Sequence, residues 1–302
     1  MKVKDGICGL AVGDALGVPV EFYSRSELEE FPIEGMTGYG TYNMPPGTWS
    51  DDTAMTLATM DSIIDKKAID YNDMMIKFSQ WLNEDAYMQT KTFDCGKTTS
   101  RAIRRFNKDI PPLECGGADE RSNGNGSLMR ILPLAYIPNI DYETIENVSG
   151  LTHAHKRAKI ACVLYIEIAR SMIENDLSID EHVKLASDKI KSYYKDFSRE
   201  LLHFNRILDD ELKEPIFSNG YVINTIEAVI YCLKTTDSYK SAVLKAVNLG
   251  SDTDTVGAIC GGLAGIYYGF DAIPVDWLSE IDKIEYVYEL CEKYDGVTDE
   301  YL

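Results

Sequence analysis

Apolar residues recur along most of the chain at intervals of three and four positions, which is the spacing of one face of an α-helix. The pattern predicts helices over residues 54–64, 70–84 with Asp70 or Asn72 as N-cap, from 93 onward, 151–172, within 178–215, 219–231, 239–247 and 281–294. Alternation of apolar and polar residues, the mark of a half-buried strand, does not extend over any convincing length. We therefore expect a nearly all-α fold without an internal repeat.

Two further apolar segments carry glycine at helical spacing in place of large side chains. The first has Gly6, Gly9, Gly13 and Gly17, and the second has Gly257, Gly261, Gly265 and Gly269. A glycine costs a helix about 1 kcal/mol relative to alanine, so four on one face indicate that another backbone approaches there. We expect the two helices to cross closely, which would bring Glu21, just after the first, toward Asp252 and Asp254 at the start of the second.

The composition is that of a globular protein, and we expect one domain over residues 1–302. Of its 302 residues, 45% are hydrophobic and 26% are charged. No apolar run approaches the ~18 to 20 residues of a membrane span, and the first residues lack the apolar stretch of a signal peptide, so we expect an intracellular, cytoplasmic protein that does not bind membranes. Seven scattered cysteines without a C-x-x-C pair indicate neither a disulfide framework nor a thiolate zinc site.

The charge balance is strongly acidic, with 30 Lys and Arg against 49 Asp and Glu and a formal net charge of -19. Proteins that bind a nucleic-acid backbone do so through basic surfaces, so a nucleic-acid partner is not expected. The charge favours cations instead. It still permits a small anionic ligand, because backbone amides and a single arginine can form a local anion site.

Acidic and hydroxyl side chains gather at the starts of two expected helices. One stretch is Trp49-Ser-Asp-Asp-Thr53, and the other is Gly250-Ser-Asp-Thr-Asp-Thr-Val-Gly257. One of these side chains could cap its helix, but capping does not use several. Buried carboxylates repel one another, and protonation or a divalent cation relieves the repulsion. Because two unrelated stretches share this chemistry, we predict a site for a hard metal ion, bound through oxygen atoms only.

Other polar residues are candidates for binding or catalysis. Asp94 stands at the entry of an expected helix, as a cap or as a functional carboxylate. In Asn123-Gly-Asn-Gly-Ser127 the backbone amides could bind an anion, with Arg130 nearby, although the pattern is not a P-loop. Of His153 and His155, which do not share a helix face, we expect one to be a polar ligand contact or a cap and the other to be incidental. Asp14 is expected to be a buried hydrogen-bond acceptor.

Taken together, these pieces resemble the ADP-ribosylglycohydrolase family. The matching motifs are Gly13-Asp-Ala-Leu-Gly17 with Glu21, Trp49-Ser-Asp-Asp-Thr53, Asn125-Gly-Ser-Leu-Met-Arg130, His153-Ala-His155 and Gly250-Ser-Asp-Thr-Asp-Thr-Val-Gly257. They follow one another in the family's order and cover about residues 6 to 270. The two aspartate motifs are specific, and the histidine pair is weak.

The resemblance implies a single-domain orthogonal helical bundle with a two-metal centre, usually of Mg²⁺ or Mn²⁺, that cleaves ADP-ribose from an acceptor and releases it. By this resemblance one metal would be held by Ser50, Asp51, Asp52 and Asp254, and the other by Asp252, Asp254, Thr255 and Glu21. Many relatives have threonine at the position of Ser50, and both residues offer a hydroxyl. The general base would be Glu21 or Asp94. The substrate would contact Asn125, Gly126, Ser127, Arg130 and His155, and the loops 24–48 and 107–124 would border the acceptor.

Several functions stay open at this point. The first is removal of ADP-ribose from a protein side chain, with arginine favoured. The second is hydrolysis of another ADP-ribosyl linkage, on serine, a nucleobase or a small metabolite. The third is a non-catalytic ADP-ribose-binding or structural paralogue, which is expected to have lost metal ligands that this chain retains. A metal-dependent phosphohydrolase from outside the family would be supported by further histidine ligands, but the four histidines present form no suitable cluster.

Overall fold

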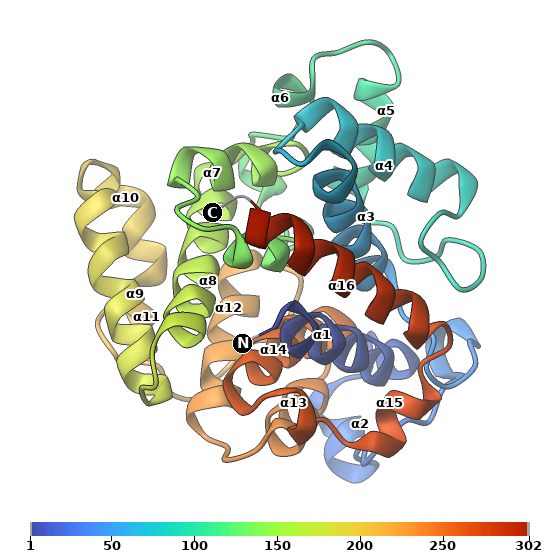
Figure 1. Ribbon diagram of the computed structural model, residues 1–302. Helices are drawn as coiled ribbons and strands as arrows, with labels where there is room; N and C mark the ends of the chain where they lie inside the picture. Colours follow the sequence, from blue (N-terminus) through green and yellow to red (C-terminus); the bar gives the residue numbers. More distant parts are fainter. Residues whose placement is uncertain (1, 301–302) are drawn as a thin grey trace.

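The computed structural model describes residues 2–300, and within that range the chain is helical and contains no β-strand (Figure 1). This confirms the expected all-α fold. The α-helices are α1 (Val3–Gly17), α2 (Arg25–Glu30), α3 (Asp51–Lys66), α4 (Tyr71–Glu84), α5 (Lys97–Phe106), α6 (Pro112–Cys115), α7 (Tyr142–Gly150) and α8 (Lys156–Glu174). They continue with α9 (Ile179–Tyr193), α10 (Ser198–Leu201), α11 (Asn205–Leu208), α12 (Val222–Lys234), α13 (Tyr239–Val247), α14 (Thr253–Tyr268), α15 (Val275–Glu280) and α16 (Ile284–Glu300).

Most of the helices lie where the apolar spacing predicts them. α4 begins after Asp70, whose side chain accepts a hydrogen bond from the Asp73 N–H at 2.9 Å, so the expected N-cap is confirmed. α13 has the predicted bounds, 239–247. α2, α6, α7 and α15 were not predicted. They are short, and each begins in a segment where proline, glycine or polar residues conceal the helical spacing.

The predicted crossing of the two glycine-rich helices is confirmed, and it forms the centre of the molecule. α1 and α14 pack along their whole length, and both lie in the middle of Figure 1. A Cβ atom on Gly13 would lie 2.1 Å from the Gly257 carbonyl oxygen, and one on Gly261 would lie 2.2 Å from that of Gly9. No side chain fits at such distances. The missing side chains therefore allow the contact that places the two helix ends.

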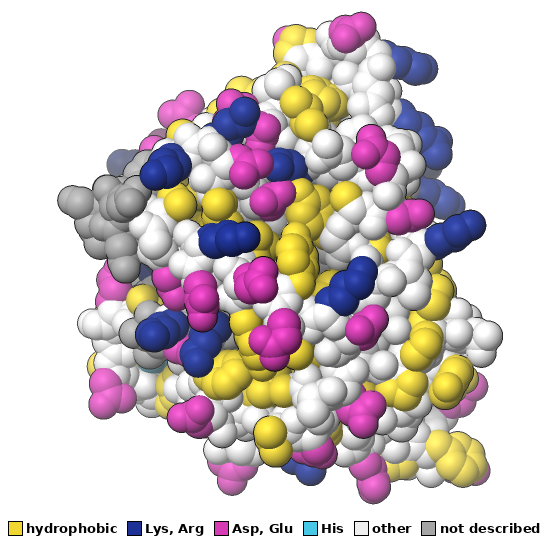
Figure 2. All heavy atoms as spheres, turned by 45° about the vertical axis from the view of Figure 1, so that its right-hand side comes forward, with side chains coloured by type: hydrophobic (Ala, Val, Ile, Leu, Met, Phe, Trp, Pro, Cys, Tyr) yellow, Lys and Arg dark blue, Asp and Glu magenta, His cyan; other side chains and the backbone are white. Residues whose placement is uncertain are grey.

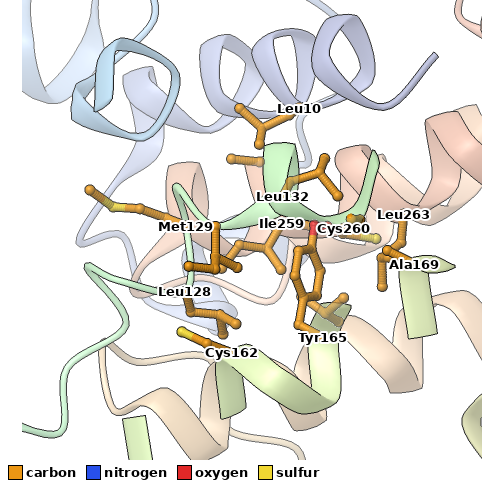
Figure 3. Close-up of a cluster of buried hydrophobic side chains, with 14 of the residues drawn as sticks. Leu10, Leu128, Met129, Leu132, Cys162, Tyr165, Ala169, Ile259, Cys260 and Leu263 are labelled. Carbon is orange, nitrogen blue, oxygen red and sulfur yellow. Dashed lines mark hydrogen bonds between the residues drawn. The ribbon is translucent and has the colours of Figure 1, made fainter. Parts of the chain in front are cut away.

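Apolar side chains from four elements surround this crossing. Figure 3 shows Leu10 of α1, Leu132 of the 3-10 helix η4 (Leu132–Tyr136), Tyr165 of α8, and Ile259 and Leu263 of α14 packed together. Each is at most 1% exposed. The Tyr165 hydroxyl donates to the Ile259 carbonyl oxygen at 3.1 Å, which leaves no unpaired polar atom on that ring. Burial of each large apolar side chain contributes about 1.5 to 3 kcal/mol, so this layer holds α8 and η4 against the central pair.

The outer helices form two groups on opposite sides of the central pair. α3 to α6 lie at the upper right of Figure 1, and α9 to α11 lie at its left edge. α16 packs across α1 and α3. None of the seven cysteines forms a disulfide, and six of them are buried. No helix in the described part of the chain is both long and apolar enough to cross a membrane.

Candidate metal centre and its cavity

The crossing of α1 and α14 brings together carboxylates that are distant in the sequence. Oxygen atoms of Glu21, Asp252 and Asp254 all lie within 4.8 Å of one another, and so do oxygen atoms of Asp14, Asp52 and Asp254. Glu21 follows α1 through the 3-10 helix η1 (Val18–Val20), while Asp254 stands in the first turn of α14. The expected approach of Glu21 to the aspartate pair is therefore confirmed. Asp254 belongs to both groups and joins them.

Two of the fully buried aspartates, Asp52 and Asp254, each keep one oxygen atom without a partner in the described part of the chain. Asp52 Oδ2 accepts hydrogen bonds from the hydroxyls of Ser50 at 3.1 Å and Thr255 at 3.2 Å, and Asp254 Oδ1 accepts the Thr255 N–H at 2.9 Å. Asp52 Oδ1 and Asp254 Oδ2 are buried and have no hydrogen-bond partner among residues 2–300. Unpaired buried carboxylate oxygens are costly, and a divalent cation satisfies them. The donor set contains only oxygen, as Mg²⁺ and Mn²⁺ prefer.

Helix capping accounts for Ser50, whose hydroxyl accepts the Asp52 N–H at the start of α3, but not for Asp252 or Asp94. Asp252 occupies the N-cap position of α14, but its carboxylate makes no cap hydrogen bond and accepts the Asn125 amide at 2.8 Å instead. Asp94 lies in the left-handed backbone region at φ 48°, and the N-cap of α5 is Gly96. Neither the Asp252 nor the Asp94 side chain therefore caps a helix, which was the structural role considered for them.

Asp14 has a different role from its acidic neighbours. Its carboxylate accepts the N–H groups of Ser50 and Thr53, both at 2.9 Å, and the Thr53 hydroxyl at 2.6 Å. These donors belong to the start of α3, so Asp14 fixes that helix end against α1. The expectation of a buried acceptor is confirmed. Burial, opposed by the hydrogen bonds from Thr53 and Ser50, raises the pKa of Asp14 to about 6.

Burial and mutual repulsion raise the pKa values of the whole cluster. The pKa of Glu21 rises to about 8 because of burial and then the charge of Asp94. Burial also raises the pKa values of Asp51, Asp52 and Asp254 well above the usual range for a carboxyl group, and neighbouring carboxylates add to the effect. In the absence of a cation, such a cluster holds protons at neutral pH.

A cavity of about 230 Å³ opens beside the cluster. Seven of the residues predicted for the site line it, and these are Glu21, Asp51, Asp94, Asn125, Gly126, Asp252 and Thr255. Ser50, Asp52 and Asp254 lie beneath its floor and are fully buried. Residues at the start of α5, from Gly96 to Thr99, form another part of the wall. The predicted metal ligands therefore lie together at one end of the cavity.

The loop that was predicted to bind an anion has backbone amides without an acceptor in the described part of the protein. Within the described residues, the N–H groups of Gly126 and Ser127 have no hydrogen-bond acceptor. Gly126 lines the cavity, whereas the side chain of Ser127 is turned into the protein, where its hydroxyl accepts a hydrogen bond from Ser149 at 2.9 Å. Backbone amides, rather than the serine hydroxyl, are thus what this loop offers to a ligand.

Arg130 does not reach the cavity, in contrast to the prediction that it contacts substrate. It is fully buried, and its guanidinium donates to the carbonyl oxygens of Gly126 and of Val148, the latter at 3.2 Å. The guanidinium carbon also lies 4.9 Å from the centre of the Phe78 ring. Burial lowers the pKa of Arg130 to about 10. Arg130 therefore supports the anion-site loop from beneath.

The histidine that lines the cavity is His153, whereas the prediction named His155. His153 is 3% exposed, and its Nδ1 pairs with the Thr152 hydroxyl at 2.8 Å, while Nε2 makes no hydrogen bond to any described residue. Burial and the charge of Arg130 lower the pKa of His153 to about 3, so the ring is neutral. His155 caps α8 and accepts the Arg157 N–H at 3.2 Å. One histidine is a cap, as expected, but the other faces the cavity.

Tyr42 is a residue of the site that the sequence did not reveal. Its hydroxyl donates to Glu21 Oε2 at 2.5 Å, and its ring packs on Phe93 with the ring centres 4.8 Å apart. Tyr42 belongs to the 3-10 helix η2 (Gly40–Tyr42), and Phe93 directly precedes Asp94. Tyr42 thus connects the two segments that carry the candidate bases.

Comparison with known proteins identifies the family and the fold. The model of the ADP-ribosylglycohydrolase family matches residues 1–301. The ADP-ribosyl-dinitrogen reductase glycohydrolase of Rhodospirillum rubrum is 33% identical over 92% of this chain and 89% of its own length. An ADP-ribosylarginine hydrolase of Serratia proteamaculans is 28% identical over 97% of this chain and 78% of its own length. A solved ADP-ribosylglycohydrolase-related protein complex has a chain that superimposes with a TM-score of 0.84, at 28% identity and 98% coverage of both chains.

Proposed function

The chain belongs to the ADP-ribosylglycohydrolase family, and from this premise we propose that it uses two divalent cations to hydrolyse the bond between ADP-ribose and an acceptor. The observation that carries the proposal is the pair of unpartnered buried oxygens, Asp52 Oδ1 and Asp254 Oδ2, at the floor of the cavity. Ser50, Asp51, Asp52 and Asp254 would hold one cation, and Asp252, Asp254, Thr255 and Glu21 the other. When bound, the two cations supply neutralising charge and Lewis acidity to the groups that contact them.

The acidic wall of the cavity suits the charge that this reaction develops. Cleavage of a glycosidic bond builds positive, oxocarbenium-like charge on the sugar, and water must be deprotonated as it attacks. Glu21 and Asp94 both line the cavity. We assign the removal of that proton to one of these two carboxylates. Burial, and then the charge of neighbouring carboxylates, raises the pKa of each, which makes either a stronger base than an exposed carboxylate.

The remaining wall of the cavity offers groups for the diphosphate of ADP-ribose. The unused amides of Gly126 and Ser127 would donate to its oxygens, and the neutral His153 would contribute a hydrogen bond from Nε2. Asn125 is committed to Asp252 at 2.8 Å and therefore orients that carboxylate. An anionic ligand can bind in an acidic protein because these donors are local and fixed.

Arginine is the acceptor that we favour. A guanidinium leaving group is cationic, and Glu21 and Asp94 present negative charge to it at the cavity wall. The relative from Serratia proteamaculans is named an ADP-ribosylarginine hydrolase. The alternative is a different ADP-ribosyl linkage, such as serine, because the loops 24–48 and 107–124, which would border the acceptor, have no recognisable code for it.

The test is release of ADP-ribose from ADP-ribosyl-arginine and ADP-ribosyl-serine peptides, with Mg²⁺, Mn²⁺ or a chelator. We expect release that requires the metal and that Asp254→Ala abolishes. The exposed Asp276→Ala on α15 serves as the matched control and should retain full activity. Release that persists in chelator, or in Asp254→Ala, would refute the two-metal mechanism. Metal-dependent binding of ADP-ribose without release from either peptide would indicate another acceptor or a non-catalytic protein.

A further inference from the structure

α5 carries a row of basic side chains on one face. Lys97, Arg101, Arg104, Arg105 and, in the turn that follows, Lys108 occupy positions i, i+4, i+7, i+8 and i+11, and all five are exposed. The opposite face, with Thr99, Ala102 and Ile103, is buried. Several Lys and Arg side chains follow one another along the upper right-hand edge in Figure 2, at the level where Figure 1 places α4 to α6. We call the five residues the α5 basic face.

The α5 basic face is not neutralised by the protein's own carboxylates. The chain has 49 acidic residues, yet none lies within ion-pair distance of these five cations in the described residues. Arg105 donates to a backbone oxygen, that of Glu114, at 2.7 Å. Elsewhere exposed lysines do pair, as Lys184 does with Asp188 at 3.2 Å. A positive surface that remains unpaired in so acidic a protein is available to an external anion.

Helix stability does not explain this arrangement. Cations favour the C-terminal end of a helix, so Arg104 and Arg105 suit their positions, but Lys97 stands at the N-terminal end, where the helix dipole opposes it. Arg101 has a like charge one turn away on both sides, at Lys97 and Arg105, and such pairs destabilise a helix. The α5 basic face therefore lowers the stability of the helix that carries it.

The α5 basic face adjoins the catalytic cavity. Lys97, Thr98 and Thr99 line the cavity wall, and the helix runs outward from there. With a rise of about 1.5 Å per residue, its ten residues extend about 15 Å from the cavity rim. A molecule whose modified side chain enters the cavity would therefore place its neighbouring surface against the face.

We propose that the α5 basic face docks an acidic stretch of the ADP-ribosylated protein substrate, beside the modified side chain. This proposal rests on the hydrolase function proposed above. An acidic protein surface suits the α5 basic face better than a nucleic acid does. The face is long enough to contact only a few carboxylates of a partner, and the overall charge of -19 repels a long polyanion. The remaining acidic surface of the enzyme would repel the acidic substrate protein in other orientations. The α5 basic face therefore also sets the orientation in which the substrate approaches.

The experiment compares two peptides that carry the same ADP-ribosylated residue, one flanked by glutamates and one by glutamines. Wild type is compared with the triple variant Arg101→Glu, Arg104→Glu and Lys108→Glu, which leaves Lys97 at the cavity and Arg105 at its carbonyl contact. We expect wild type to prefer the glutamate-flanked peptide in kcat/KM. The variant should lose about tenfold on that peptide and stay within about twofold on the other, as expected for lost electrostatic steering.

A matched control introduces the same charge change on the opposite side of the molecule. Lys184→Glu, Lys191→Glu and Lys195→Glu all lie at exposed positions on or directly after α9. This control should keep the wild-type preference, which separates a local patch from a change in net charge. The preference of wild type should also disappear near 1 M salt, where the screening length falls to about 3 Å. Thermal unfolding of both triple variants confirms that they are folded.

Each result bears on the proposal. An unchanged preference in the α5 variant, or an equal loss in the α9 control, would overturn it. Binding of a single-stranded oligonucleotide that the α5 variant alone loses would assign the face to nucleic acid and would also overturn it. If wild type releases ADP-ribose from both peptides without preference, the hydrolase function stands and only the docking role fails. If wild type cleaves neither peptide in either linkage, the hydrolase function fails, and the docking role with it.

Discussion

Among single residues, Tyr42 has the most specific expected effect. Its hydroxyl donates to Glu21 Oε2 at 2.5 Å, while its ring packs on Phe93. Tyr42→Phe removes the hydrogen bond and keeps the ring contact. A hydrogen bond to a charged group contributes about 1.5 to 3 kcal/mol, so loss of Glu21 positioning should lower kcat about tenfold or more. Steady-state kinetics, together with calorimetric titration of Mg²⁺, would measure both the rate and the metal affinity.

The control for Tyr42→Phe is Tyr87→Phe. The Tyr87 hydroxyl also donates to a carboxylate at 2.5 Å, that of Asp61, which lies outside the cavity lining and keeps Lys77 at 2.8 Å. The two variants thus delete the same chemical group from the same kind of hydrogen bond. Only Tyr42→Phe should change kcat and metal affinity. Equal losses in both variants would mean that Tyr42 contributes to general stability alone.

His153 allows a second residue-scale prediction. Its Nε2 faces the cavity and has no protein partner, so His153→Ala should weaken ADP-ribose binding about tenfold, the effect of one lost hydrogen bond. Because the pKa of His153 is lowered to about 3, the ring stays neutral, and the loss should be the same at about pH 5 and about pH 8. Calorimetric titration at both pH values tests this. His155→Ala, which changes a helix cap, should bind normally.

At the scale of elements, the crossing of α1 and α14 determines whether the site forms. Gly13→Ala and Gly257→Ala each place a Cβ within 2.5 Å of the other helix's carbonyl oxygen, so the helices must separate. We expect each to destabilise the protein by about 2 to 4 kcal/mol and to weaken metal binding, because Glu21 comes just after the end of α1 and Asp254 stands in the first turn of α14. Denaturant unfolding and metal titration measure these effects.

Gly296→Ala on α16 is the matched control for the crossing. A Cβ there meets no atom within 4 Å, so the same substitution removes a poor helix former without a clash. It should leave the stability unchanged or raise it by up to about 1 kcal/mol. If Gly13→Ala were tolerated as well as Gly296→Ala, close backbone contact would not be what the glycines provide.

The spacing of residues predicts most of the elements and the crossing between them. The glycine rows of α1 and α14 were sufficient because close backbone contact explains repeated glycines on one helix face, although Gly269 lies beyond the end of α14 as its C-cap and a Cβ there would meet no atom within 4 Å. α2 was missed although it starts with a capping box, in which Ser24 and Glu27 exchange hydrogen bonds, because it has one buried residue and shows no apolar spacing. Short helices of this kind depend on local caps rather than on a core-facing row.

The acidic half of the site was also predictable, whereas its outer half was not. Carboxylates at helix starts are visible in the sequence, and the metal ligands inferred from the family remain a prediction that their placement supports. The choice between His153 and His155, and the inward turn of Arg130, depend on backbone conformation that no residue pattern encodes. Tyr42 lies in a loop rich in glycine and proline, where side-chain direction cannot be inferred from spacing.

At the scale of the whole molecule, the acidic charge acts differently on the two kinds of ligand. A net charge of -19 draws divalent cations toward the cluster and repels the diphosphate of ADP-ribose. In the proposed function the anion would be bound by fixed local dipoles, such as the amides of Gly126 and Ser127. Bound cations would also reduce the repulsion. Binding of metal and of ADP-ribose should accordingly be cooperative, with tighter ADP-ribose binding in Mg²⁺ than in chelator.

The raised pKa values determine how the stability of the metal-free protein depends on pH. Carboxyl groups with lowered native pKa values make a protein less stable as pH falls, whereas these groups make it less stable as pH rises. Carboxyl groups titrate near 4 in the unfolded chain, whereas burial raises the pKa of Asp14 to about 6 and that of Glu21 to about 8 in the native state. Between about pH 4 and pH 8 the native state therefore binds more protons than the unfolded state. The free energy of unfolding should fall as pH rises through this window.

Divalent cations should reverse that dependence, because they bind the deprotonated carboxylates. We expect Mg²⁺ or Mn²⁺ to raise the thermal midpoint slightly at about pH 5 and several times more at about pH 8, relative to chelator. Asp254→Asn removes one of the carboxylates with an unpartnered oxygen and should reduce both the loss of stability with pH and the gain from metal. The difference between wild type and this variant isolates the cluster from the other titrating groups. A metal-induced shift of equal size at both pH values would contradict the linkage, since the cations would then be binding to carboxylates that had already lost their protons at pH 5.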